Sequence, residues 1–157
     1  MEQVRLEVVD IWHFGMSALF ERDTDLEVLA QQISADFLSL PGDVAEGRSE
    51  KERIHSATEA LAQHALESKG FSVALFGALM QACGLSPAEL YRHYVGKNVL
   101  NFFRQDHGYQ EGTYLKEWQG REDNEHLSEL LEELDESAPG FPEAVYQALA
   151  SRYAAMA

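Results

Sequence analysis

The N-terminal segment 5–21, RLEVVDIWHFGMSALFE, constrains the fold more than any other part of the chain. Read as a helix, it carries apolar side chains in nearly every direction around its axis. These side chains are Leu6, Val8, Val9, Ile11, Trp12, Phe14, Met16, Leu19 and Phe20. A helix that is apolar almost all round is stable in water only when other elements surround it. The segment therefore predicts a helix buried in a bundle.

Further helices are predicted wherever periodic apolar residues lie between caps and breakers. They are expected at 25–40, 49–69, 72–83, from 87 onward, from 125 to 136 and at 141–156. Asp25 is expected to cap the second helix, and Pro41-Gly42 to stop it. No segment shows the strict alternation typical of strands, and no repeat appears. The predicted fold is one all-α domain over 1–157, a multi-helix bundle, and 157 residues can build a sizeable core.

Four polar residues share one arc of the otherwise apolar segment 5–21: Glu7, Asp10, His13 and Ser17. Glu7 and Asp10 stand at i and i+3, so their carboxylates project from neighbouring positions on one helix face. Carboxylates in apolar surroundings are unfavourable unless a cation or hydrogen bonds compensate them. Mg²⁺ prefers carboxylate oxygens and would supply that compensation. A structural ion pair with a Lys or Arg of another helix is the alternative.

A second stretch, 97–121, is slightly cationic within a strongly acidic chain. It holds four Lys or Arg against three Asp or Glu and nets +1, whereas the chain nets -15. On a helix, Lys97, Asn101 and Arg104 line one face and can donate hydrogen bonds to phosphate oxygens. The opposite side is expected to pack against the core. It gathers Tyr91, Val95, Val99 and Phe102. Ordinary surface charge is the alternative explanation for the cations.

Two glycine-containing turns follow, HGY at 107–109 and EGTY at 111–114. Glycine permits tight turns and lets backbone N–H groups approach a ligand closely. Ordinary turns are the alternative explanation. More polar and aromatic groups continue on a segment that is expected to be irregular: Lys116, Trp118, Arg121 and Asn124. The sequence therefore predicts an anion site around this stretch, with phosphate as its ligand.

These two regions resemble one known family. The pattern K-N-x-L-N-x-F-R from Lys97, followed by G-Y-x-x-G-x-Y-x-K-x-W-x-G-x-E-D-N from Gly108, resembles the C-terminal signature of the dimeric, all-α dUTPases. These enzymes are relatives of the MazG-like nucleoside triphosphate pyrophosphatases. The LEVVDIWHF block from Leu6 resembles the family's E-x-x-D metal helix with its following His-Phe. The two blocks stand in the family's order, which makes the resemblance specific.

The resemblance implies an Mg²⁺-dependent homodimer that hydrolyses dUTP, with dUDP as a second candidate substrate, to dUMP. Glu7 and Asp10 would be the metal ligands, and His13 would lie near the base. The phosphates would be held or covered by six further residues. These are Lys97, Asn101, Arg104, Tyr109, Lys116 and Asn124.

The family's metal site also includes an E-x-x-E pair on an earlier helix, and only six residues precede Glu7. Glu2, the one carboxylate among them, does not align with Glu7 on the helical wheel. We therefore expect either a truncated chain or a natural short variant, incomplete as given, whose water-activating carboxylate belongs to the absent segment. Two alternatives remain: a nucleotide-binding pseudoenzyme, and a helical interaction protein whose motif residues have become structural.

Composition narrows the function further. The acidity of the chain disfavours nonspecific nucleic-acid binding, and no G-x-x-x-x-G-K-[ST] loop is present. The single cysteine, Cys83, excludes an internal disulfide and suits a reducing cytoplasm. Charged residues at the start argue against a signal peptide. The sequence has no run of about 18 apolar residues, so nothing in it suggests a membrane partner. A cytoplasmic protein that binds a small anionic ligand is the expectation.

Overall fold

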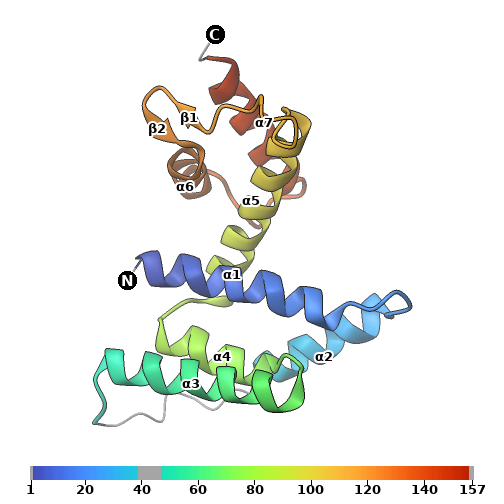
Figure 1. Cartoon of the computed structure of the whole chain (residues 1–157), viewed down its shortest axis with the longest axis vertical. Coiled ribbons are helices and arrows are strands. Elements are labelled where there is room, and N and C mark those ends of the chain that lie inside the picture. The colour runs from blue at the N-terminus through green and yellow to red at the C-terminus, as the bar shows by residue number, and fades with distance from the viewer. Residues whose placement is uncertain (1, 39–46, 156–157) are drawn as a thin grey trace. The chain divides into compact units, whose positions relative to one another are not determined.

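A computed structural model of the chain shows helices and one small hairpin (Figure 1). The structure describes residues 2–38 and 47–155. The all-α fold predicted from the sequence is confirmed. The chain divides into two compact units, Met1–Ser86 and Pro87–Ala157. That the whole of 1–157 behaves as one domain stays a prediction.

The first unit contains four helices (Figure 1). They are α1 Glu2–Leu19, α2 Leu26–Leu38, α3 Glu50–Ser68 and α4 Val73–Ala82. Helix α4, the most apolar of the four in sequence, contacts each of the other three. The predicted stop at Pro41-Gly42 lies outside the described residues.

Three of these helices begin where the sequence predicts, each directly after a capping side chain, of which Asp25 was predicted as a cap. Asp25 Oδ1 accepts hydrogen bonds from the backbone N–H groups of Glu27 and Val28, at 3.0 and 3.2 Å. The hydroxyls of Ser49 and Ser72 each accept a backbone N–H from the first turn of α3 and α4, both at 3.3 Å. Each cap satisfies a donor that has no partner within the helix, which fixes the helix start.

The core of the first unit is built around Trp12, which is 7% exposed. Its ring centroid lies 5.7 Å from that of Phe37, 6.0 Å from that of Phe71 and 4.9 Å from that of Phe76. The Phe71 ring occupies the space that a Cβ atom at Gly15 would need. Glycine at position 15 therefore allows the backbone of α1 to approach this ring closely.

Helix α1 is buried on one side only, in contrast to the prediction. Val8 and Val9 are buried, but Phe14 is 77% exposed and Phe20 is 44% exposed. Within the unit, α1 packs against α4, and Phe14 lines an apolar groove that α1 shares with α3. The prediction was wrong for this face because an apolar surface can border a groove as well as a packed helix.

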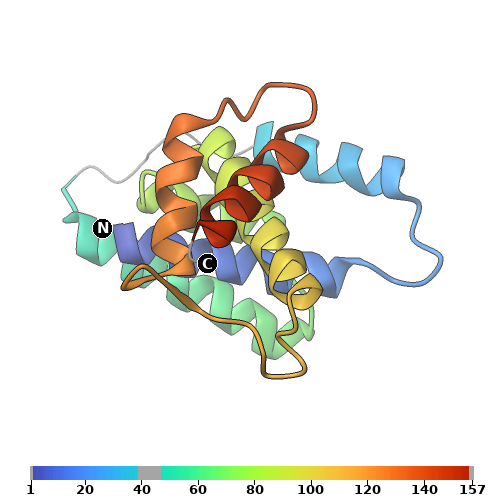
Figure 2. The same ribbon diagram turned by 90° about the horizontal axis from the view of Figure 1, so that it is seen from above.

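The second unit consists of three helices and a small hairpin (Figures 1 and 2). Its elements are α5 Pro87–Asp106, β1 Glu117–Trp118, β2 Arg121–Glu122, α6 Asp123–Glu133 and α7 Phe141–Ala154. Helix α7 contacts both α5 and α6. The strands pair antiparallel, with Glu117 opposite Glu122 and Trp118 opposite Arg121.

The hairpin was not predicted. Its two-residue turn, Gln119 and Gly120, has positive φ at both positions, +53° and +79°. Two consecutive positive φ angles give a turn whose twist matches that of the paired strands. The turn directs Trp118 inward, where it is 0% exposed and its indole Nε1 donates to the Leu115 carbonyl at 2.7 Å.

Helix α5 buries a face that overlaps the predicted one only in part: Val99 is buried as expected, and Val95 packs against the core. The buried residues include Gly96, Val99, Leu100 and Phe103, and Phe103 contacts a set of aromatic rings: His107, Tyr114, Trp118, Tyr146 and Tyr153. Tyr91 and Phe102, which were expected in the core, are 48% and 58% exposed. The buried face of α5 is determined by where α6 and α7 pack. The spacing of apolar residues along α5 alone does not reveal this.

An ion-pair network joins the hairpin, α6 and α7 on the surface of the second unit. Glu129 accepts hydrogen bonds from Arg121 Nη2 and Arg152 Nη1, both at 2.7 Å. These two bonds lower the pKa of Glu129 to about 2, and the bond from Arg121 has the larger effect. His126 is buried and stacks on Trp118.

Cys83, the single cysteine, is buried at the end of α4 with 1% of its surface exposed. Burial raises the pKa of its thiol. Its carbonyl accepts a hydrogen bond from Arg5 Nε at 3.2 Å. Among the described residues, no single helix is both long and apolar enough to cross a membrane, although α4 and α5 taken together meet that test.

Candidate functional site

The predicted site residues divide between the two units. Glu7, Asp10 and His13 lie on α1 of the first unit. The predicted phosphate-binding residues all lie in the second unit. Lys97, Asn101 and Arg104 are on α5, Tyr109 and Lys116 are in the segment that follows, and Asn124 is in the first turn of α6.

The three residues on α1 differ in their surroundings. Glu7 is exposed, and its Oε1 accepts a hydrogen bond from Gln3 Nε2 at 2.9 Å. Asp10 and His13 are half-buried. His13 Nδ1 lies 3.2 Å from the Val9 carbonyl oxygen. Because a carbonyl only accepts, Nδ1 carries the proton in this bond, which makes Nε2 the acceptor of the neutral ring.

Glu7 and Asp10 form a pair of hard oxygen donors. Within residues 2–38 and 47–155, no group of three or more His, Cys, Asp or Glu side chains could hold a metal ion. Two carboxylates do not make a protein cage, but Mg²⁺ usually keeps several waters and takes only one or two carboxylates together with phosphate oxygens. The donor chemistry of the pair thus fits Mg²⁺ shared with a phosphate ligand.

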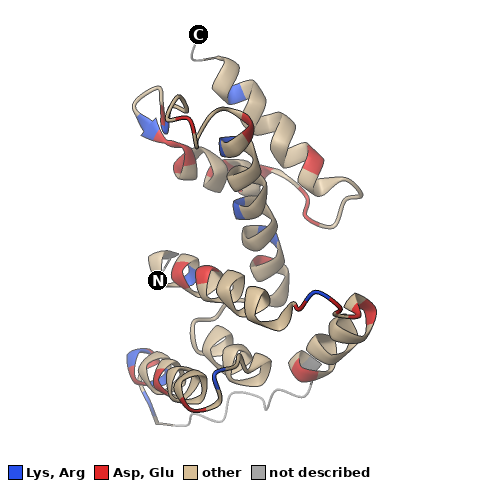
Figure 3. Ribbon diagram, turned by 45° about the vertical axis from the view of Figure 1, so that its right-hand side comes forward, with Lys and Arg blue, Asp and Glu red and all other residues tan. Residues whose placement is uncertain are grey.

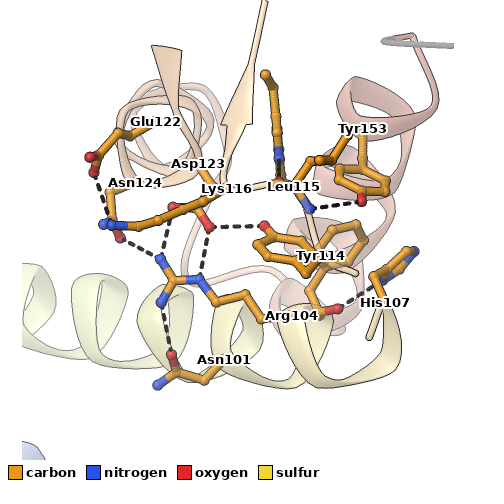
Figure 4. A network of polar contacts seen from close by, with 12 residues as sticks. Asn101, Arg104, His107, Tyr114, Leu115, Lys116, Glu122, Asp123, Asn124 and Tyr153 are labelled. Carbon is orange, nitrogen blue, oxygen red and sulfur yellow. Dashed lines mark hydrogen bonds and ion pairs between the residues drawn. The ribbon is translucent and has the colours of Figure 1, made fainter. Parts of the chain in front are cut away.

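In the second unit, Arg104 is the centre of a polar network (Figure 4). Its Nε and Nη2 donate to Oδ2 and Oδ1 of Asp123, both at 2.8 Å. Nη1 lies 3.4 Å from Asn101 Oδ1, and Nη2 lies 3.4 Å from Asn124 Oδ1. Three of the predicted residues, separated by up to 23 positions in the sequence, thus come together around one guanidinium.

Two residues of this network were not singled out from the sequence. Asp123 is 0% exposed, and the Tyr114 hydroxyl donates to its Oδ2 at 2.9 Å. Burial, followed by the hydrogen bond to Asp123, raises the pKa of the Tyr114 phenol. The hydrogen bond to Asp123 raises the pKa of Arg104. The only sequence signal for Asp123 is its place in the E-D-N end of the motif.

The remaining predicted residues lie nearer the surface. Lys116 Nζ forms an ion pair with Glu122 Oε2 at 3.4 Å, and both side chains are about half exposed, at 51% and 52%. Tyr109 is 56% exposed, with its ring centroid 6.1 Å from that of Tyr114. Lys97 is half-buried on α5. Figure 3 shows further basic residues along α5 and in the hairpin.

The glycine turns close on themselves. The backbone N–H of Tyr109 donates to the Arg104 carbonyl at 3.0 Å, and those of Thr113 and Tyr114 donate to the Gly108 carbonyl at 3.0 and 3.3 Å. These three N–H groups therefore shape the loop and do not face a ligand, contrary to the role expected for the turns. Gly108 has φ +88°, and Thr113 Oγ1 fills the space of its missing Cβ.

The described residues are mostly helical, so the protein is of the all-α class. It carries a carboxylate pair on α1 and a polar cluster of Asn101, Arg104 and Asp123 at α5 and α6. The chain belongs to the dUTPase family, because the family model described as dUTPase matches residues 1–109. The matched residues include the first unit, α5 and Tyr109, whereas Lys116 and Asn124 lie beyond them. A comparison with curated proteins finds no match.

Membership confirms the resemblance to the all-α dUTPases, with which a relation to the MazG-like pyrophosphatases is consistent. It supports a dUTP diphosphatase-like function for the chain and a deoxyuridine nucleotide as its ligand.

Proposed function

We propose that the chain is an Mg²⁺-dependent nucleotide pyrophosphatase that hydrolyses dUTP, and also dUDP, to dUMP. The family match supports the substrate class. The observation that carries the proposal is the convergence of Asn101, Arg104 and Asn124, which gathers hydrogen-bond donors suited to phosphate oxygens at one point of the second unit.

Each phosphate-side residue has a distinct proposed role. Arg104 supplies a planar fork of N–H groups, and the amides of Asn101 and Asn124 flank it. Lys116 is a point charge on a flexible stem, and its exposed pair with Glu122 is weak enough to be replaced by a phosphate. Lys97 on α5 and the exposed Tyr109 complete the proposed phosphate-binding set.

The metal and the base are assigned to α1. Glu7 and Asp10 would hold Mg²⁺, which when bound neutralises charge on the phosphate oxygens. His13, whose Nδ1 is fixed by the Val9 carbonyl, keeps the buried Nε2 as an acceptor whose chemistry suits a base N–H such as that of uracil. Among the described residues, no side chain is assigned to orient the attacking water.

A nucleotide-binding protein without catalysis is the second candidate. One observation favours it: the described residues hold no cluster of three metal-ligating side chains. Hydrolysis of a phosphoanhydride needs groups that neutralise charge and orient water, whereas binding needs only the phosphate-side donors.

The test measures pyrophosphate release from dUTP with Mg²⁺, together with dUTP affinity. We expect release that requires Mg²⁺, and that Asp10→Ala lowers on the order of 100-fold. Glu59→Gln, which alters an exposed carboxylate of α3, is the matched control and should retain full activity. Binding of dUTP without release would establish the second candidate. Neither binding nor release would leave a helical interaction protein.

Base specificity is tested by the same assay with dTTP, dCTP and UTP as competitors. The proposal expects dUTP to be preferred, and expects His13→Ala to weaken dUTP binding more than it weakens binding of inorganic triphosphate, which lacks a base. If His13→Ala weakened the binding of both ligands equally, His13 would not contact the base.

We also propose that two copies associate, and that the protein works in the cytoplasm. The first unit carries a groove of about 500 Å³ between α1 and α3, lined by apolar residues that include Ile11, Phe14 and Leu61. Sedimentation equilibrium should show a dimer that Phe14→Ser weakens. Leu66→Ser, which alters an equally exposed side chain of α3 outside the groove, is the control.

A further inference from the structure

Asp123 is a fully buried carboxylate that accepts hydrogen bonds, among the described residues, from one arginine and one tyrosine. Its two oxygens accept Arg104 Nε and Nη2 at 2.8 Å and the Tyr114 hydroxyl at 2.9 Å (Figure 4). Its backbone N–H donates to the Lys116 carbonyl at 2.9 Å. A carboxylate buried to this degree is stable only while such partners stay in place, so the Arg104–Asp123 pair holds together.

Arg104 has donors left over once this pair has formed. A guanidinium carries five N–H groups, and Asp123 takes two of them. Beyond Asp123 and the neighbouring Tyr114, the guanidinium makes two long hydrogen bonds, 3.4 Å each, to the amide oxygens of Asn101 and Asn124. Bonds of that length are weak, so the outer edge of the fork can turn to a stronger acceptor such as a phosphate oxygen.

The neighbouring pair behaves differently. Glu122 stands one position before Asp123, but its contact with Lys116 is 3.4 Å long and half exposed on both sides. Such a pair is screened by water and holds neither partner firmly. The two consecutive carboxylates thus differ in their surroundings: Glu122 is half exposed in a loose ion pair, whereas Asp123 is buried and accepts two short hydrogen bonds from Arg104.

We propose that Asp123 is a positioning residue, which holds the Arg104 fork so that its outer N–H groups face a bound phosphate. Tyr114 supports Asp123 from the other side. The inference rests on the proposed function of this site. The positioning role and simple charge repulsion predict opposite effects on anion affinity. Removing the negative charge of Asp123 should weaken anion binding if the residue positions Arg104, and strengthen it if the residue only repels the anion.

The experiment measures, by calorimetry on the full chain, the affinity for dUTP and for inorganic triphosphate. Asp123→Asn keeps the shape of the side chain and removes its charge. We expect it to weaken binding of both ligands by about 10- to 100-fold, the value of a charge-assisted hydrogen bond. Glu122→Gln is the matched control, and should leave the affinity unchanged or raise it, because Lys116 loses a competitor.

A double-mutant cycle separates positioning from folding. Arg104→Lys keeps the charge but loses the fork, so adding Asp123→Asn to it should cost little further affinity. The full loss repeated in that background would mean a merely structural role and would overturn the proposal. If Asp123→Asn does not fold, Tyr114→Phe decides: a severalfold loss supports positioning, and unchanged affinity overturns it.

The outcomes for the unaltered chain separate the two levels of inference. If it binds neither dUTP nor inorganic triphosphate, the proposed function of the site fails, and the positioning role fails with it. If it binds both, and Asp123→Asn binds as tightly or more tightly, only the positioning role is overturned. Tighter binding would show that Asp123 acts simply as a repelling charge.

Discussion

Gly96 on α5 packs against Leu131 on α6, and the two positions are predicted to be energetically coupled. A Cβ atom at position 96 would lie 2.7 and 2.8 Å from the two Cδ atoms of Leu131 and 3.2 Å from its Cγ. Leu131 is 2% exposed and belongs to the core of the second unit, so it has little room to move aside. Gly96→Ala should therefore force the core apart, although alanine is the better helix former.

The magnitudes of the two effects can be compared. Alanine in place of glycine favours a helix by about 1 kcal/mol, whereas overpacking a core costs about 1–3 kcal/mol. The free energy of unfolding should therefore fall by about 0–2 kcal/mol. Leu131→Ala alone should lower it by about 2–5 kcal/mol. In the double variant the new methyl group occupies part of the cavity, so the combined loss should be about 1–3 kcal/mol smaller than the sum.

Urea unfolding followed by tryptophan fluorescence measures these values. Trp118 lies in the core of the second unit and Trp12 in that of the first, so a Trp12→Phe background isolates the relevant signal. Phe102→Ala compared with Phe102→Gly, at a 58% exposed position of α5, gives the helix preference without packing. The packing argument would be refuted if the double variant lost as much unfolding free energy as the two single variants together. It would also be refuted if Gly96→Ala made the chain about 1 kcal/mol more stable.

Three further predictions concern single residues of the second unit. Gly108→Ala should lower the free energy of unfolding by about 1–3 kcal/mol, because φ is +88° and Thr113 occupies the Cβ position; no change in urea unfolding would contradict it. Tyr114, whose pKa is raised by burial and by Asp123, should lose its proton later than an ordinary phenol. Its hydrogen bond stabilises the fold below about pH 10 and is lost as pH rises through the raised pKa, so Tyr114→Phe should remove the latest step of an absorbance titration. Glu129, with a pKa lowered to about 2, stabilises the fold above its ordinary pKa of 4.5 and loses that contribution as pH falls toward 2. The unaltered chain should have a higher free energy of unfolding than Glu129→Gln, and this difference should shrink as the pH falls across that range. A constant difference would be evidence against the ion-pair network.

The sequence predicted the helices because their signals are local. Asp25, Ser49 and Ser72 cap helices at the expected places, since a cap depends only on the next few residues. Spacing of the same kind placed Asn101 and Arg104 on one face of α5, where their side chains do approach each other.

The missed features depend on contacts between distant segments. Phe102 and Phe103 are adjacent and chemically identical, and only the position of α6 and α7 decides that Phe103 is buried. The strands of the hairpin have two residues each, too few to show an alternating pattern. Asp123 resembles any acidic residue at a helix start, and its partner Arg104 lies 19 positions earlier in the chain.

The buried thiol at the end of α4 can serve as a chemical probe of how often that region opens. Cys83 is the only thiol in 157 residues, and it is 1% exposed. A thiol reagent can therefore react at one place only, and only in those moments when the end of α4 separates from its surroundings. The rate of that single reaction, compared with the rate in urea, reports how often the first unit opens while the rest of the chain stays folded.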